Sequence, residues 1–225
     1  MLTPKNVLTP FQNEVLSFFF KIKDSIYFLL TGGSALAEFY LGHRKSFDLD
    51  IFTSEKELIL PFSRNLEEEM KKRFSVLVTR RFETFVEFEI GNGTESIKLQ
   101  LAYESPFRFE PPFESSNGIR VNDYKDLATD KLLAFFGRAE PRDAIDIYFI
   151  LQSEDFWTLV QQASQKDPGF DLYWLAIAMA RVSEFPDDIH RWPVEMVLDF
   201  KVDELKKLFS DLTAKLMDKI KDLEK

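Results

Sequence analysis

The spacing of apolar residues along the first fifty positions predicts two helices and two strands. Apolar side chains recur at helical spacing over residues 11–23, which predicts an opening amphipathic helix. A short apolar run at 27–30 predicts a buried strand that enters the turn at 31–34. We expect a helix over 34–41 that ends at Gly42, because glycine commonly terminates helices.

Alternation of apolar and acidic residues over 47–52 predicts a strand with Asp48 and Asp50 on the same face, because side chains of a strand repeat every second residue. A hairpin signal, Gly91-Asn92-Gly93, joins two of the strands that follow. Further strands are predicted at 76–82, 84–90, 96–102 and 119–121, with a surface helix at 56–73.

From residue 123 onward the pattern changes to helices almost throughout. Helices are predicted at 123–136, 142–151, 154–162, 172–182 and 202–223. This change indicates an α+β protein, in which residues 1–122 form a mixed sheet flanked by helices and residues 123–225 form a helical C-terminal lobe.

Composition narrows the class of protein. The chain has 225 residues, 45% of them hydrophobic and 30% charged, a balance typical of a folded protein. It contains 24 Phe, so aromatic rings are expected to fill much of the core. The three tryptophans are expected in the core or in the packing of the helical lobe. The absence of cysteine excludes a disulfide framework, a cysteine-based zinc site and a cysteine nucleophile. No secretion signal or apolar run of membrane-spanning length is present, so we expect a cytoplasmic protein without a membrane partner.

The net charge of −9 argues against a dedicated duplex-DNA binder, which normally presents a basic face. It is compatible with a nucleoside triphosphate, because the magnesium that accompanies a triphosphate is itself bound by carboxylates.

The segment 29–52 carries the candidate chemistry. A Gly32-Gly33 pair between a strand and a helix lets backbone N–H groups approach an anion, and the Ser34 hydroxyl can donate to the same anion. Asp48 and Asp50, two residues apart on one strand, can share divalent cations that bridge a triphosphate. Either feature alone is commonly structural, since glycine turns and Asp-x-Asp pairs on exposed strands are frequent.

In this order and spacing, the segment LLTGGSALAEFYLGHRKSFDLDIF resembles the signature of the nucleotidyltransferase superfamily that shares its core with DNA polymerase beta. Arg44 and Ser46, ahead of Asp48-Leu49-Asp50, make it similar to the AbiEii/AbiGii toxin branch. The resemblance implies that Asp48 and Asp50 bind Mg²⁺ or Mn²⁺. It also implies a set of nucleotide-binding residues, namely Gly32, Gly33, Ser34, Arg44 and Ser46.

A second segment, 126–151, resembles the helical motif of the same branch. The matching residues are Lys131, Arg138, Arg142, Asp143 and Asp146. The resemblance implies that Lys131 contacts the triphosphate as part of the catalytic set. Arg142, Asp143 and Asp146 are accessory candidates, with a helix cap and a structural ion pair as the alternative.

One position departs from the superfamily pattern. A neighbouring strand often carries a third carboxylate, and the aligned residue here is Gln100, which offers an oxygen without a charge. Three explanations stay open: a base supplied by Glu104 or Asp143, a different strand register, or a site that binds nucleotide without transferring it.

The resemblance therefore implies a metal-dependent enzyme that transfers a nucleoside monophosphate from a nucleoside triphosphate to an acceptor, with RNA (tRNA) or a protein as candidate acceptors. It also implies an antitoxin protein as a candidate partner. The alternative is a degenerate relative that binds nucleotide or a partner protein without catalysis.

Overall fold

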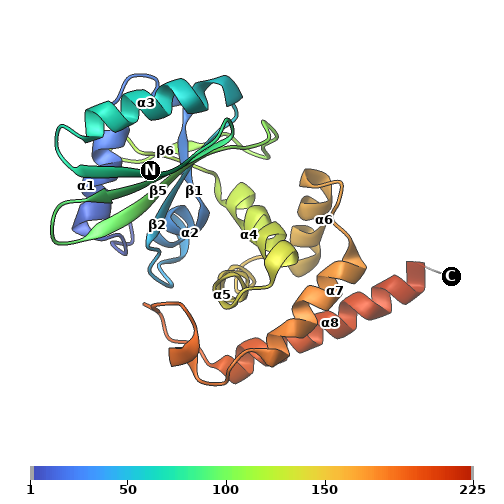
Figure 1. The fold of residues 1–225 in the computed structure, drawn as a ribbon. Helices are drawn as coiled ribbons and strands as arrows, with labels where there is room; N and C mark the ends of the chain where they lie inside the picture. Colours follow the sequence, from blue (N-terminus) through green and yellow to red (C-terminus); the bar gives the residue numbers. More distant parts are fainter. Residues whose placement is uncertain (1–2, 224–225) are drawn as a thin grey trace. The chain divides into compact units, whose positions relative to one another are not determined.

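The computed structural model describes residues 3–223, which divide into two units within a helix, one ending at Leu127 and the other beginning at Ala128. The first unit contains the sheet, and the second is helical (Figure 1).

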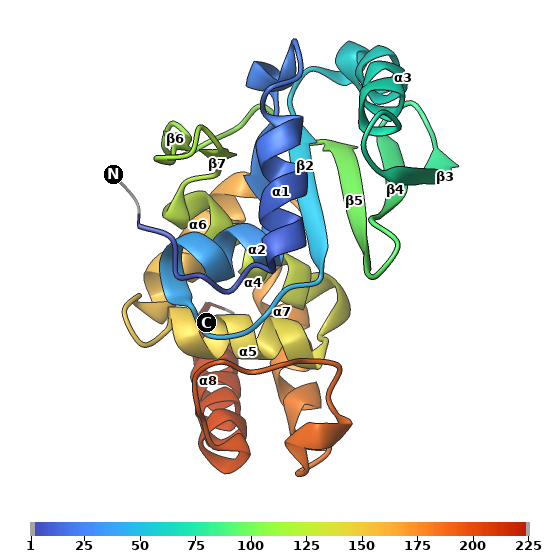
Figure 2. The ribbon, with the colours of Figure 1, turned by 90° about the vertical axis from the view of Figure 1, so that its left-hand side faces the viewer.

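A seven-stranded mixed sheet in the described residues organises the first unit, with the order β3-β4-β5-β2-β1-β7-β6. Strand β2 runs parallel to β5, and β1 runs parallel to β7, whereas the other neighbours are antiparallel. Figure 2 shows β2, β5, β4 and β3 following one another in this order. The strands are β1 Leu29–Thr31, β2 Asp48–Thr53, β3 Ser75–Arg81, β4 Phe85–Gly91, β5 Ser96–Tyr103, β6 Phe113–Glu114 and β7 Arg120–Val121.

Helix α3 packs against β3, β4 and β5, and Figure 1 shows it lying over one face of the sheet. That face is apolar, because Leu49 of β2, Leu99 of β5 and Phe88 of β4 are buried in register with one another. The helical segments of this unit are α1 Pro10–Phe19, η1 Ser25–Tyr27, α2 Gly32–Leu36, η2 Ala37–Leu41, η3 Lys56–Leu58 and α3 Ile59–Met70.

Phenylalanine rings join α1 and α3 to the sheet, as the composition predicted. Phe28, at the entry to β1, stacks on Phe62 of α3 with ring centroids 4.3 Å apart, and Phe19 of α1 contacts both rings. All three side chains are buried, so they form part of the core between these helices and the sheet.

The segment after β1 is helical from Gly32 to Leu41, as predicted, but its second half is a π-helical turn. The turn ends at Gly42, whose φ is +66° and whose N–H donates to the carbonyl of Ala37. Within the turn, the carboxylate of Glu38 accepts hydrogen bonds from the backbone N–H groups of Val7 and Leu8, at 2.8 and 2.9 Å. This buried acid therefore holds the start of the chain against the helix.

Strand β3 is an end strand of the sheet, and its pairing with β4 is interrupted by a bulge between Val78 and Arg80. Before the bulge, Leu77 pairs with Glu89; beyond it, Arg80 pairs with Glu87.

The second unit contains the rest of α4 and four further helices with two short 3₁₀ turns between α7 and α8. Its core includes Phe135 of α4 against Phe209 of α8, with ring centroids 5.2 Å apart. The elements are α4 Tyr124–Arg138, α5 Pro141–Ile150, α6 Phe156–Lys166, α7 Leu172–Ala180, η4 Arg181–Glu184, η5 Ile189–Arg191 and α8 Val202–Leu223.

These elements confirm the predicted α+β class, a mixed sheet flanked by helices. The opening helix is shorter than predicted and ends at Phe19, and β6 was not predicted. The expectation that the tryptophans lie in the core or in the packing of the lobe was wrong for Trp174. Trp192 is 4% exposed, but Trp157 and Trp174 are 38% and 61% exposed.

Candidate active site

Asp48 and Asp50 project from the same face of β2, opposite the apolar face on which Leu49 and Ile51 are fully buried. Both aspartates are half-buried, so their carboxylates remain accessible while the strand is fixed by the core. This arrangement follows directly from the alternating sequence.

The glycine turn lies against this acidic strand. Gly32 has φ +67°, and a Cβ placed on it would lie 2.2 Å from Oδ2 of Asp50. Asp50 therefore occupies the space in which any other residue at position 32 would carry its side chain. The two halves of the sequence motif, eighteen positions apart along the chain, meet at this contact.

The Arg-x-Ser residues meet the second glycine of the turn. A Cβ on Gly33 would lie 2.8 Å from Nη2 of Arg44 and 2.9 Å from Oγ of Ser46. Five of the predicted nucleotide-site residues are thus brought together in the first unit: Gly32, Gly33, Arg44, Ser46 and Asp50.

Ser34 is fully buried, and its hydroxyl donates to the backbone carbonyl of Asp48. This contact ties the start of α2 to the acidic strand and fixes the distance between turn and strand.

Gln12 of α1 supports the segment that leads into β2, and sequence reasoning did not identify it. Its side-chain oxygen accepts from the N–H of Thr9 in a capping box, while its Nε2 donates to the carbonyls of Ser46 and Phe47 at 2.7 and 3.3 Å. The Thr-x-x-Gln spacing was a visible signal for the cap, but the contact with residues 46 and 47 depends on the fold.

Gln100 lies directly opposite Asp50 in the parallel pairing of β2 with β5. On its other side it lies opposite Glu87 of β4, and its Nε2 donates to Oε2 of Glu87 at 2.9 Å. Glu87 is 8% exposed, and it also accepts a hydrogen bond from the hydroxyl of Thr79 at 2.8 Å. The Thr79 hydrogen bond, aided by the one from Gln100 and by nearby Arg80 and Lys98, lowers the pKa of Glu87 against the opposing effect of burial.

A second group of polar residues surrounds Asn122, at the end of β7. Asn122 donates to the hydroxyl of Thr31 at 3.2 Å and accepts from Arg108 at 2.8 Å. Arg108 in turn pairs with Glu104, one of the carboxylates considered as a base. Tyr40 donates to the carbonyl of Asn122, and its pKa is raised by burial and by the charge of Asp123.

The motif residues of the second unit form ion pairs. Nζ of Lys131 lies 2.8 Å from Oδ2 of Asp146, whose side chain is fully buried. Arg138 donates two hydrogen bonds to Asp143, at 2.7 and 2.8 Å, and Asp143 is also fully buried. Arg142 is half-buried and forms an ion pair with Glu140 at 2.9 Å. Both oxygens of Asp143 therefore accept from an arginine, whereas Lys131 is held in place by Asp146.

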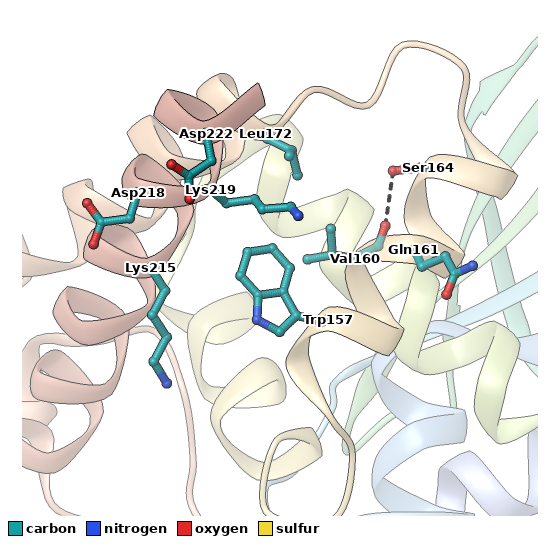
Figure 3. A pocket seen from close by; sticks show the side chains of 9 residues that line it. All are labelled: Trp157, Val160, Gln161, Ser164, Leu172, Lys215, Asp218, Lys219 and Asp222. Atoms are coloured by element: carbon teal, nitrogen blue, oxygen red, sulfur yellow. Dashed lines mark hydrogen bonds between the residues drawn. The ribbon is translucent and has the colours of Figure 1, made fainter. Parts of the chain in front are cut away.

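A cavity of about 770 Å³ lies among α6, α7 and α8 within the second unit. Figure 3 shows the indole of Trp157 at its centre, with side chains of α8 on one side. Lysines and aspartates of α8 line it in equal numbers, namely Lys215, Lys219, Asp218 and Asp222. It contains none of the residues that the sequence motifs single out.

The donor set at β2 fits a divalent cation that arrives with a nucleotide. Within the described part of the chain, no three histidine, cysteine, aspartate or glutamate side chains gather into a group that could hold a metal ion alone. Mg²⁺ usually binds proteins through one or two carboxylates and completes its shell with phosphate oxygens and water. Asp48 and Asp50 supply two carboxylates, and the backbone of the glycine turn lies against Asp50. In addition, no helix among residues 3–223 is long and apolar enough to cross a membrane.

Two solved structures resemble this chain in fold. A crystal structure from H. pylori, assigned as a nucleotidyltransferase, matches with a TM-score of 0.61 and 17% identity over 97% of this chain and 100% of that chain. The structure of JHP933 from Helicobacter pylori matches with a TM-score of 0.56 and 17% identity over 96% of this chain and 98% of that chain. No curated protein sequence matches the chain.

At this identity the structural likeness shows the fold, which is that of a nucleotidyltransferase. The family model described as the nucleotidyl transferase AbiEii toxin of a type IV toxin–antitoxin system matches residues 19–222. The chain therefore belongs to the AbiEii family of nucleotidyltransferase toxins.

Proposed function

We propose that the chain transfers a nucleoside monophosphate from a nucleoside triphosphate to an acceptor, using a divalent cation held by Asp48 and Asp50. The observation that supports the proposal best is the contact between Asp50 and Gly32, because it brings a carboxylate of the type that Mg²⁺ prefers against a backbone turn suited to phosphate. Family membership supports the same chemistry.

The residues of the first unit have separate tasks in this proposal. The backbone N–H groups at Gly33 and Ser34 approach the phosphates, and Arg44, held against Gly33, supplies positive charge beside them. The hydroxyl of Ser34 ties the turn to the acidic strand, and Ser46, whose Oγ lies beside Gly33, is proposed to contact the nucleotide. When bound, the cation neutralises phosphate charge and aligns the reacting phosphorus with the acceptor oxygen.

Lys131 is proposed to contact the triphosphate, as its motif implies. The buried carboxylate of Asp146 fixes the direction of its ammonium group. Charge of this kind stabilises the pyrophosphate leaving group as it forms. Arg138, Asp143 and Arg142 have a supporting role in the second unit.

RNA and protein are the acceptor classes to be tested, and the toxin family favours a cognate antitoxin protein as the partner that restrains the activity. We place the reaction in the cytoplasm, where nucleoside triphosphates and both acceptors occur.

Transfer is tested by incubating the protein with labelled triphosphates, Mg²⁺ and bulk RNA or cell protein, and measuring incorporated label and released pyrophosphate. Transfer is expected for the wild type and should fall roughly hundredfold or more in Asp48→Asn, because the variant loses charge at the cation. Glu89→Gln, which removes an exposed carboxylate elsewhere on the sheet, is the matched control and should retain activity.

The competing function, nucleotide binding without transfer, is motivated by Gln100 at the position opposite Asp50. It predicts Mg²⁺-dependent triphosphate binding by calorimetry with no pyrophosphate release on any acceptor. Absence of triphosphate binding in the wild type would refute both functions.

A further inference from the structure

We propose that Glu87 is a positioning residue that turns the carbonyl oxygen of Gln100 toward the cation site at Asp50, so that an amide supplies the oxygen which a third carboxylate would otherwise provide. This inference rests on the proposed function, since it concerns the cation that Asp48 and Asp50 hold.

The strand register places the three side chains in one row. Asp50 pairs with Gln100 across β2 and β5, and Gln100 pairs with Glu87 across β5 and β4. Residues directly opposite one another on adjacent strands project from the same face, with Cβ atoms about 5 Å apart. Gln100 is therefore flanked by Asp50 on one side and by Glu87 on the other.

The chemistry of the pair sets the orientation of the amide. Nε2 of Gln100 lies 2.9 Å from Oε2 of Glu87. An ionised carboxylate only accepts hydrogen bonds, so the NH₂ end of the amide must face Glu87. The oxygen of the same planar amide then lies on the side away from Glu87, and the proposal directs it toward Asp50, the other neighbour of Gln100 in the row.

Glu87 is itself held in place by its neighbours. Its other oxygen accepts from the hydroxyl of Thr79 at 2.8 Å, and Arg80 lies 3.9 Å from that oxygen. With 8% of its surface exposed, it has little freedom to choose other partners.

An amide oxygen is a normal ligand for hard cations but carries no charge. The site therefore has two negative charges rather than three, and we expect it to bind the cation together with a triphosphate better than the cation alone. Glu87 completes the arrangement without becoming a ligand, because it acts through Gln100.

The test measures Mn²⁺ binding in the presence of a non-hydrolysable triphosphate analogue, read from the electron paramagnetic resonance signal of free Mn²⁺. Glu87→Gln allows the Gln100 amide to pair in either orientation and should weaken Mn²⁺ binding roughly tenfold to hundredfold. Gln100→Ala should weaken it to a similar degree. In the Gln100→Ala background, Glu87→Gln should not weaken Mn²⁺ binding further, because the amide that Glu87 orients is no longer present.

Glu89→Gln is the matched control, since Glu89 lies two residues away on the same face of β4 and loses the same charge. Equal weakening by Glu89→Gln, an additional loss in the double variant, or unchanged binding in a folded Glu87→Gln protein would each overturn the inference. If Glu87→Gln does not fold, Thr79→Val is used instead, because Thr79 is exposed and its hydroxyl donates the hydrogen bond that holds Glu87. A smaller loss of Mn²⁺ affinity is expected for this variant. Unchanged binding in Thr79→Val would then count against the inference.

Failure of the proposed function has a different signature. In that case the wild type binds no Mn²⁺–triphosphate, or Asp48→Asn binds it as well as the wild type does. If wild-type Mn²⁺ binding depends on Asp48 but the Glu87 and Gln100 variants bind Mn²⁺ as well as the wild type does, the proposed function is retained and this inference is refuted.

Discussion

Replacing Gly32 by alanine should have two effects, backbone strain at position 32 and a steric collision of the new Cβ with Asp50. At φ +67° a residue with a Cβ is strained by about 1–2 kcal/mol. The same methyl group would lie 2.2 Å from Oδ2 and 2.9 Å from Cγ of Asp50. Ordinary contact begins near 3.4 Å, so the carboxylate must move by about 1 Å.

A displacement of this size in a reacting group commonly costs about a hundredfold in rate. We therefore expect Gly32→Ala to lose about 1–2 kcal/mol of unfolding free energy from strain and about a hundredfold in pyrophosphate release. Stability is measured by urea denaturation, and the rate by released pyrophosphate under conditions in which the variant is folded.

Gly118→Ala is the control for strain alone. Its φ is +76°, and no atom lies within 4 Å of an added Cβ, so it should show the same loss of stability with an unchanged rate. The reasoning is refuted if folded Gly32→Ala releases pyrophosphate as fast as Gly118→Ala does.

Two further predictions concern the contribution of ion pairs to stability, with one pair in each unit. Hydrogen bonds from Lys71 and Arg81, both at 2.5 Å, lower the pKa of Glu67. These contacts should stabilise the fold fully above about pH 4.5, and the stabilisation should be lost as the pH falls through the lowered pKa. Glu67→Gln should therefore be less stable than the wild type at pH 7 and equally stable in acid. Asp146→Ala leaves the buried Lys131 ammonium group without this partner and should cost roughly 3–5 kcal/mol in urea denaturation at pH 7.

Each of these predictions has an outcome that contradicts it. A stability difference for Glu67→Gln that persists unchanged at pH 2 would show that packing, rather than ionisation, carries the effect. For Asp146→Ala the control is Asp211→Ala, which removes an exposed pair with Lys207 and should cost less than about 1 kcal/mol. Equal losses in these two variants would mean that burial does not strengthen the Lys131 pair.

Local chemistry made much of the nucleotide site predictable. Alternation over 47–52 required Asp48 and Asp50 to share a face, and a glycine pair at a strand–helix junction indicated a tight turn. The contact between Gly32 and Asp50 could be expected only from the resemblance, because it joins the start of α2, directly after β1, to strand β2. Pattern alone does not state which strands are neighbours.

Glu87 could have been found by following the hairpin signal further. Gly91 pairs with Ser96 across the turn, and this pairing places Glu87 opposite Gln100. The ion pair of Lys131 with Asp146 was beyond such reasoning, because it joins two helices whose packing depends on the core of the second unit. The exposure of Trp174 was mispredicted for a related reason, since a large apolar residue type does not by itself reveal which face of a helix is covered.

The bulge in β3 bears on the behaviour of the protein at high concentration. An end strand presents unpaired backbone groups that can recruit a strand from another molecule and begin aggregation. Here the strand also exposes Leu77, which would favour such pairing. The bulge after Val78 interrupts the regular spacing of the edge, and the arginines that follow it add charge there. The protein therefore carries, at one end of its sheet, a local defect that opposes fibril-like self-association.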